Sequence, residues 1–134
     1  MTNYFTNANF AVMEKSLDAL WQRQQVIANN ISNFNTPGYK AKSLEFENML
    51  SQTVRGMQNS AKPVSRQAAL DRINALQPAV LTDTSTEARV DGNNVDIDKE
   101  NVELARVKLQ YDYMVRKITD QFNLLKLAIN EGKG

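Results

Sequence analysis

The sequence contains neither cysteine nor histidine in its 134 residues. Cysteine supplies thiolate nucleophiles and disulfides, and histidine is the usual general base near neutral pH. Both side chains are also the principal ligands of structural zinc. Thiol catalysis, disulfide cross-links and Cys/His metal sites are therefore excluded, and the sequence predicts no cofactor.

Clustered positive charge and long apolar runs are also missing. Sixteen Lys and Arg balance fifteen Asp and Glu, which gives a formal net charge of +1. Phosphate backbones are bound by clustered basic side chains, so we expect no nucleic acid partner. The apolar runs are only a few residues long, so no membrane-spanning segment is predicted. The first residues lack the pattern of a cleavable signal, so we expect any export to use another route.

Two long segments carry the apolar periodicity of amphipathic helices. In residues 10–33 and 98–131, apolar side chains recur at alternating steps of three and four, as in coiled-coil seams. The predicted helix-packing residues are Phe10, Met13, Leu17, Leu20, Ile27, Leu104, Tyr111, Met114, Ile118, Phe122 and Leu125. The expected fold class is mainly α, with the two terminal helices paired as a coiled-coil-like antiparallel hairpin.

The second helix has clear start and stop signals. Asp96 or Asp98 is placed to cap its first turn, and Gly132 follows its last periodic residue. The surrounding aspartates do not form a calcium loop. Counting from Asp91, the sixth position lacks the required glycine and the twelfth lacks the required glutamate. We therefore interpret this stretch as a turn that leads into a capped helix.

The middle of the chain is less regular. A short helix is predicted after Ser43 as its cap, through Phe46 and Leu50. From about residue 58 to 90 the composition is polar, with two prolines, which predicts a flexible or short-stranded segment. We divide a single domain into residues 1–41 (helix and turn), 42–90 (variable middle) and 91–134 (second helix).

Helix lengths predict an incomplete core. At about 1.5 Å per residue, the first helix spans roughly 36 Å and the second roughly 50 Å. The second helix would then extend past the first by about two turns, where its apolar stripe needs residues 4–10 or a neighbouring molecule. Two helices bury little surface against about 1–2 kcal/mol of backbone entropy per ordered residue. We expect the lone chain to be marginally stable and assembly to complete its core.

Residues 28–41, ANNISNFNTPGYKA, end the first helix in a turn. Proline disfavours helical angles at Thr36, and Pro37-Gly38 suits the centre of a type II turn. Asparagine side-chain amides hydrogen-bond readily to nearby backbone groups. The asparagines in this stretch are more numerous than the end of a helix requires. We expect them to brace a fixed loop or a neighbouring subunit. The predicted turn motif comprises Asn29, Asn30, Ile31, Asn33, Thr36, Pro37, Gly38 and Tyr39.

This stretch resembles the motif of bacterial flagellar rod and hook proteins, roughly Asn-Asn-(Ile/Leu)-Ala-Asn-x-x-Thr-Pro-Gly-Tyr-(Lys/Arg). Ser32 replaces the usual alanine, a small change. The run from Asp91 through Gly92, Asn93 and Asn94 to Val115 resembles the C-terminal half of a proximal rod subunit. The short chain, without the large inserted domains of hook and distal rod proteins, agrees with that resemblance.

The resemblance implies a non-enzymatic subunit of the basal-body rod, assembled helically through its terminal helices around an export channel. The partners it implies are further copies, other rod proteins, membrane-ring and rod-adaptor proteins, and the flagellar type III export apparatus. It places the protein in the periplasmic rod, exported without signal cleavage. Phe46 and Leu50 resemble an element that such substrates present to the export gate, although they read equally well as one face of a short helix.

Two other classes of function stay open. A small helical adaptor or chaperone would bind one partner through the face of Tyr111, Val115 and Phe122. A peptidoglycan hydrolase would need a catalytic carboxylate, and none is identifiable from spacing. We interpret carboxylate pairs such as Glu45 and Glu47 as part of a solvent-exposed face.

Overall fold

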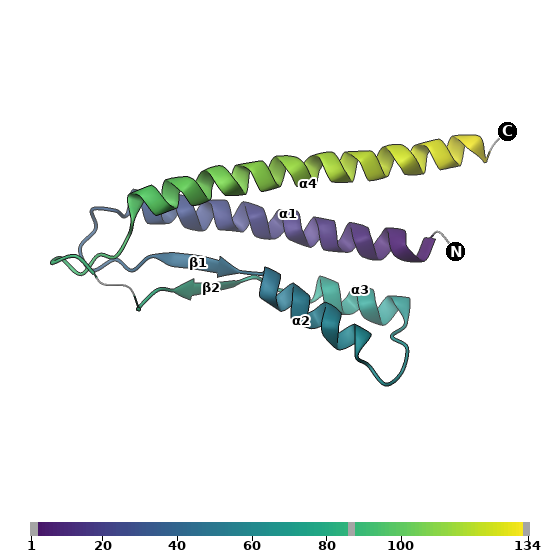
Figure 1. The fold of residues 1–134 in the computed structure, drawn as a ribbon, viewed down its shortest axis with the longest axis horizontal. Helices are drawn as coiled ribbons and strands as arrows, with labels where there is room; N and C mark the ends of the chain where they lie inside the picture. The colour runs from purple at the N-terminus through teal and green to yellow at the C-terminus, as the bar shows by residue number, and fades with distance from the viewer. Residues whose placement is uncertain (1–2, 86–87, 133–134) are drawn as a thin grey trace.

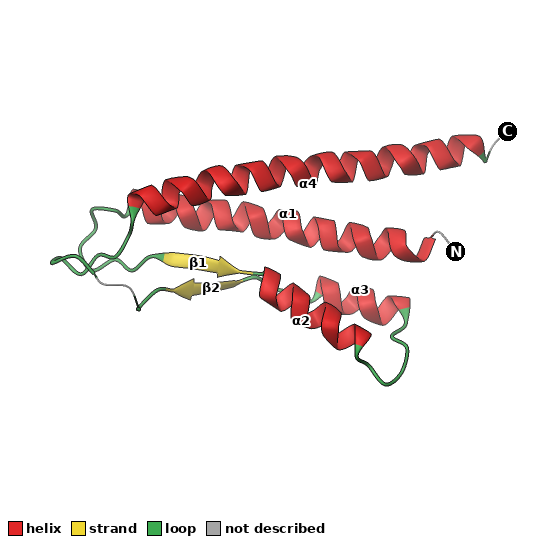
Figure 2. Ribbon diagram, viewed as in Figure 1, coloured by secondary structure: helices red, strands yellow, loops and turns green. Residues whose placement is uncertain are grey.

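The computed structural model describes residues 3–85 and 88–132. Its elements are α1 (Asn3–Ser32), β1 (Lys42–Glu45), α2 (Glu47–Gln58), α3 (Arg66–Asn74), β2 (Ala79–Thr82) and α4 (Ile97–Glu131). The fold is mainly α, and the two long terminal helices lie side by side (Figures 1 and 2). The expected fold class is confirmed. Across the described residues, no helix combines the length and apolarity needed to cross a membrane.

Helix α1 is the central element of three layers. Helix α4 covers one side of it, while β1 and α3 contact the other, and α2 packs on α3 (Figure 1). Successive helix residues point about 100° apart, so neighbours in sequence reach different layers. Leu20 faces the α4 layer, and Ala19 is buried against Leu44 and Phe46 of the middle segment.

The contact between α1 and α4 uses the predicted apolar seam. Leu20 and Ile27 enclose Val107, whose side chain is 1% exposed. Near the other end of the pair, the rings of Phe10 and Phe122 lie 4.9 Å apart. The sequence numbers of the contacting residues rise in one helix as they fall in the other, so the helices are antiparallel. Ile31, Leu104 and Met114 pack around this core, and Met13, Leu17, Ile118 and Leu125 are half-buried.

The overhang of the second helix is about half of that expected. Helix α1 begins at Asn3 instead of Phe10, so it has 30 residues against the 35 of α4. At about 1.5 Å per residue the two helices then differ by only about 7 Å.

The helix predicted after Ser43 is wrong at its start. Residues Lys42–Glu45 form β1, which pairs antiparallel with β2 so that Leu44 lies opposite Val80. Helix α2 begins at Glu47, and its N-cap residue is Phe46. Pairing with residues 34 to 40 positions away decided this conformation, and local capping signals cannot report such a partner.

The polar middle also contains α3, which the sequence did not predict. Its N-cap is Ser65, whose hydroxyl accepts a hydrogen bond from the Ala68 N–H at 3.2 Å. Ile73 and Leu76 are buried, and the Leu76 carbonyl accepts a bond from Lys15 on α1. The short-stranded expectation for this segment is confirmed by β2.

Candidate functional site

The turn after α1 has the predicted shape. The Tyr39 N–H donates to the Thr36 carbonyl at 3.3 Å, and Gly38 has φ +72°. A type II turn needs a positive φ at its third position, where glycine is unstrained. Asn33 also caps this region, since its amide donates to the Asn29 carbonyl at 2.7 Å and its side-chain oxygen accepts from the Thr36 hydroxyl at 3.0 Å.

Asn30 is the buried centre of the turn. Its side chain is fully buried, and its amide nitrogen donates to the Lys42 carbonyl at 2.7 Å. Its amide oxygen accepts from the Lys42 N–H at 2.9 Å and from the Tyr39 hydroxyl at 3.1 Å. The Asn30 amide thus hydrogen-bonds to both backbone groups of Lys42, as a neighbouring strand would.

A second buried asparagine, Asn93, reaches the same turn from the segment before α4. Its amide donates to the Asn33 carbonyl at 2.9 Å and to the Thr36 carbonyl at 2.8 Å. Its side-chain oxygen accepts from the Val95 N–H at 2.8 Å. Asn93 is fully buried and uses both sides of its amide, so it joins the end of α1 to the approach of α4.

Backbone contacts complete this joint between distant segments. The Gly38 N–H donates to the Asp91 carbonyl at 2.8 Å. Asn94 accepts from the Ala41 N–H at 2.6 Å. Gly92 has φ +83°, and a Cβ there would meet the Gly38 Cα at 3.4 Å. We call residues 29–42 and 89–100 together the clasp.

Two titratable groups lie inside the clasp. Glu100 is 8% exposed, and burial raises the pKa of its carboxyl, although a hydrogen bond with Asn30 opposes the rise. Burial, and then the charge of Glu100, raise the pKa of the Tyr39 hydroxyl. Tyr39 therefore stays neutral at physiological pH, and its O–H donates a hydrogen bond to the Asn30 side-chain oxygen.

The charged groups of the clasp serve structural bonds. The Asp96 carboxylate accepts from the N–H groups of Asp98 and Lys99 at 3.1 Å, which confirms it as the cap of α4. Arg89 donates to the Phe34 carbonyl, and its guanidinium carbon lies 4.3 Å from the centre of the Phe34 ring. Within residues 3–85 and 88–132, no group of three or more acidic side chains is placed to hold a metal ion.

Comparisons with known proteins agree with this arrangement. A family model described as flagella basal body rod protein matches residues 14–40, which end in the turn. Flagellar basal body rod protein FlgB of Bacillus subtilis (strain 168) is 34% identical over 121 residues, covering 90% of this chain and 92% of the relative. The chain belongs to the FlgB family of flagellar basal body rod proteins.

Two further FlgB relatives have lower identity to this chain. FlgB of Salmonella typhimurium is 32% identical over 111 residues, covering 78% of this chain and 80% of the relative. FlgB of Escherichia coli (strain K12) is 25% identical over 134 residues, covering 94% of this chain and 96% of the relative. As a member of the FlgB family the chain is a structural protein of the flagellar basal body and not an enzyme.

Of the predicted turn residues, Asn30, Asn33, Thr36, Gly38 and Tyr39 make the bonds described above. Asn29 and Pro37 have exposed side chains, and Ile31 packs on the core between α1 and α4. The chain buries one of the two suggested export residues and leaves the other half-buried. Phe46 is 3% exposed in the cluster with Ala19 and Leu44, and the half-buried Leu50 packs against that cluster. A receptor would reach the whole Phe46 side chain only before the chain folds.

The sequence interpretation missed Asn93, Asn94 and Glu100 as members of the site. The sequence indicates the first two only as part of a rejected calcium loop, of a turn and of the resemblance, and it does not single out Glu100 within the predicted helix. A usable signal was present, because two asparagine-rich stretches flank the two predicted helices at the end where an antiparallel pair brings them together.

Proposed function

We propose that this chain is a rod subunit that joins further copies and other rod proteins through the apolar surfaces of its terminal helices, stacking helically around an export channel. One observation carries the proposal. Of thirteen large hydrophobic side chains exposed in the described part of the chain, nine lie on α4. They are Val102, Leu109, Tyr111, Tyr113, Val115, Phe122, Leu124, Leu127 and Ile129. So much exposed apolar surface on one element is typical of a protein interface.

The clasp serves this assembly by fixing the geometry of the helix pair. Stacking repeats a contact many times, so an error in the angle between α1 and α4 would accumulate from subunit to subunit. Buried amides with complete hydrogen bonding are rigid and allow one geometry. We therefore assign the turn motif a structural role in assembly.

We further propose that the chain is exported through the flagellar type III apparatus before it folds and reaches the periplasmic rod, where it meets membrane-ring and rod-adaptor proteins at the base. Burial of Phe46 in the folded chain supports recognition of the Phe46 and Leu50 element as a signal before folding. Folding on assembly would then prevent return through the channel.

The test is complementation of a Bacillus subtilis strain that lacks its own FlgB. Expression of this chain should restore rods in isolated basal bodies and swimming on soft agar. The adaptor alternative uses Val115 and Phe122, which are 40% and 58% exposed, as the docking face for one partner. It predicts a discrete complex with one protein and no incorporation into purified rods, a result that would overturn the rod proposal.

A further inference from the structure

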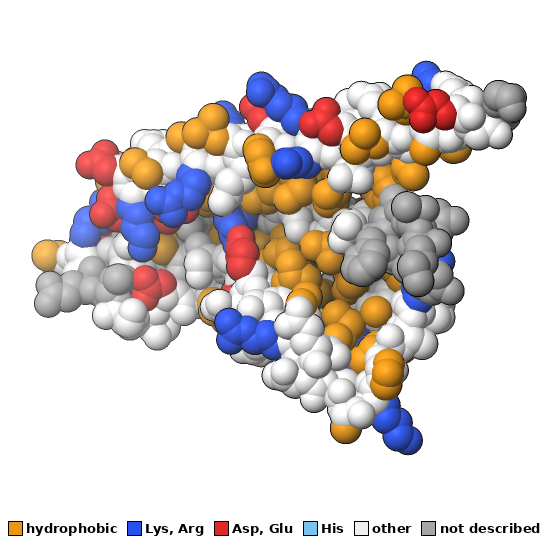
Figure 3. Space-filling view, turned by 45° about the vertical axis from the view of Figure 1, so that its right-hand side comes forward, with side chains coloured by type: hydrophobic (Ala, Val, Ile, Leu, Met, Phe, Trp, Pro, Cys, Tyr) orange, Lys and Arg blue, Asp and Glu red, His pale blue; other side chains and the backbone are white. Residues whose placement is uncertain are grey.

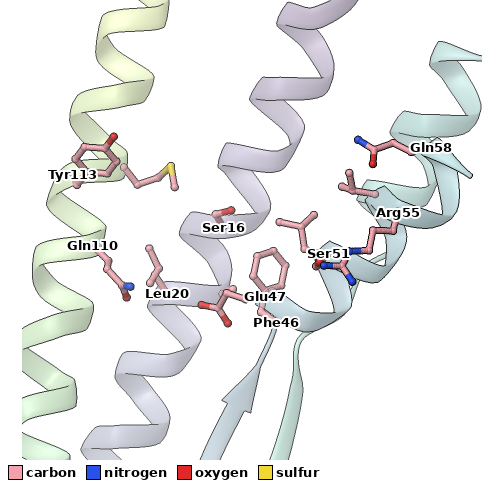
Figure 4. Close-up of a pocket in the computed structure, with 13 residues that line it drawn as sticks. Ser16, Leu20, Phe46, Glu47, Ser51, Arg55, Gln58, Gln110 and Tyr113 are labelled. Carbon is pink, nitrogen blue, oxygen red and sulfur yellow. The ribbon is translucent and has the colours of Figure 1, made fainter.

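An apolar groove of about 610 Å³ separates α2 from the pair of α1 and α4. Phe46, Leu50 and Val54 line it from the α2 side at four-residue intervals, so they form one row along the groove. Leu20 of α1 and Met114 of α4 line the opposite wall. Figure 4 shows Phe46 between α1 and α2 and Leu20 on the side of α1 that faces α4, with Ser51 and Arg55 projecting from α2.

The groove is open on the molecular surface. In the space-filling view, hydrophobic side chains gather in a hollow between the long helices and the α2–α3 layer (Figure 3). Its edge carries two charged residues of α2. Glu47 is already held by Arg23, whose guanidinium donates to both carboxylate oxygens. Among the described residues Arg55 has no acidic partner, so the groove offers one uncompensated cation.

The same chain carries a ridge of matching chemistry. Leu124 and Leu127 are 60% and 56% exposed, one helical turn apart near the end of α4. Asp120 precedes Leu124 by four residues, lines the same surface depression, and has no cationic partner in the described part of the chain. Two leucines and one carboxylate on a single helix face fit an apolar row with one arginine at its edge.

A chain cannot insert this ridge into its own groove. Helix α4 is continuous from Ile97 to Glu131, and its residues Gln110, Tyr113 and Met114 already form a wall of that groove. Residues 120–131 therefore continue past it on the same rod-like helix. The occupant must come from another molecule that carries such a ridge.

We propose that the groove between α2 and the long helices receives residues 120–131 of α4 from a second copy of this chain, with Asp120 beside Arg55. The inference rests on the proposed function, because it names one of the contacts through which copies stack. Ridge and groove are different surfaces, so the contact is heterologous and leaves a free ridge and a free groove at the two ends. Such a contact propagates into an open helical array when its rotation does not close into a ring.

The absence of native cysteine makes disulfide mapping specific. We would express the Ser51→Cys/Asn123→Cys chain in the Bacillus subtilis strain without its own FlgB and oxidise isolated basal bodies. Ser51 lines the groove and Asn123 lines the ridge. We expect a ladder of covalent oligomers, since each copy links to the next, and no ladder from either single variant. A matched control, Ser51→Cys/Asn101→Cys, places the second thiol on an exposed asparagine at the other end of α4.

The charge pair provides an independent arm. In the cysteine background, Arg55→Asp or Asp120→Arg alone should lower the ladder yield by roughly fivefold, which corresponds to about 1 kcal/mol, and the double exchange should restore it. Rods that form without a ladder, or a control that cross-links equally well, would overturn the groove assignment and leave the rod function standing. Absence of rods with the unmodified chain would instead refute the proposed function.

Discussion

Single residues hold the clasp together through buried amides. Asn30 and Asn93 are both fully buried, and each bonds to backbone groups of a segment other than its own. A carboxylate at these positions would lack donors, and an alkyl side chain would lack both kinds of group. Asparagine therefore occupies these positions because it is short and both donates and accepts.

Asn93→Ala should be among the most damaging single changes in the chain. It removes bonds to the carbonyls of Asn33 and Thr36 and to the Val95 N–H, and leaves buried polar groups without partners. We expect a loss of about 2–4 kcal/mol in the free energy of unfolding, measured by urea denaturation. Asn35→Ala is the control, because Asn35 is exposed and should change stability by less than about 0.5 kcal/mol. Equal effects would show that the amide bonds contribute little.

Gly38→Val tests the turn itself. Space is available, since nothing lies within 4 Å of a Cβ at Gly38, but φ is +72°. A β-branched side chain is strained there, by about 1–3 kcal/mol. We expect lost motility with export retained, scored by swimming and by secreted subunit. Gly56→Ala, also with open space but on a helix, should be neutral or stabilising. Normal rods in the Gly38 variant would contradict the joint role.

Glu100 and Glu47 should give opposite dependences of stability on pH. Burial raises the pKa of Glu100 in the folded chain. The contribution of Glu100 to the free energy of unfolding is therefore most favourable at low pH, where the carboxyl is protonated, and is lost as pH rises through the folded-state pKa. Glu100→Gln should then stabilise the fold at neutral pH, with the gain vanishing in acid. The Arg23 hydrogen bond lowers the pKa of Glu47, so Glu47→Gln should destabilise at neutral pH and match the parent in acid. Thermal unfolding at several pH values measures both, and parallel curves would refute the assignment.

At the scale of elements, α4 has two roles that lie on different parts of its surface. One face packs on α1 through Val107, while other faces leave Leu109, Leu124 and Leu127 exposed. A helix with apolar side chains on several faces is stable only when several neighbours cover it. The monomer supplies α1, and the other neighbours must come from assembly.

Deletion of residues 120–134 should separate these two roles. It removes Phe122, Leu125 and Ile129 but keeps the buried cluster around Val107. We expect a folded, helical chain by circular dichroism that forms no rods in the complementation strain. Deletion of residues 131–134 alone is the control and should leave assembly unchanged. Intact rods from the longer truncation would refute an assembly role for the end of α4.

At the scale of the whole molecule, layers of helix lie on both sides of α1 and few side chains are fully enclosed. The buried hydrophobic core is small and falls into separate clusters around Ala19 and Leu20. Such a chain gains stability from any contact that only the folded form can make.

The midpoint of thermal unfolding should therefore rise with protein concentration. The dependence follows by mass action when the folded chain self-associates and the unfolded chain does not. Circular dichroism melts over a hundredfold concentration range, with sedimentation velocity at each concentration, provide the measurement. A helical monomer whose melting temperature is independent of concentration would contradict a core completed by assembly.

Much of this architecture was predictable because its causes are local. Alternating three- and four-residue apolar steps predicted both long helices, Asp96 was one of two predicted caps, and Pro37-Gly38 predicted the turn. The helix start at Ser43 was wrong, and α3 was missed, because tertiary contacts of Leu44 and Ile73 decide those segments.

The sequence by itself determined the two amphipathic helices, the turn between α1 and β1, and the absence of thiol and imidazole chemistry, since each depends on residue type and spacing along the chain. Only the tertiary structure decided that Asn93 and Asn94 brace the turn, that Glu100 is buried beside Asn30, and that α1 lies between two layers. The contacts of Asn93, Asn94 and Glu100 join residues more than fifty positions apart. Their free energy arises from burial and hydrogen bonds that exist only after the chain has packed.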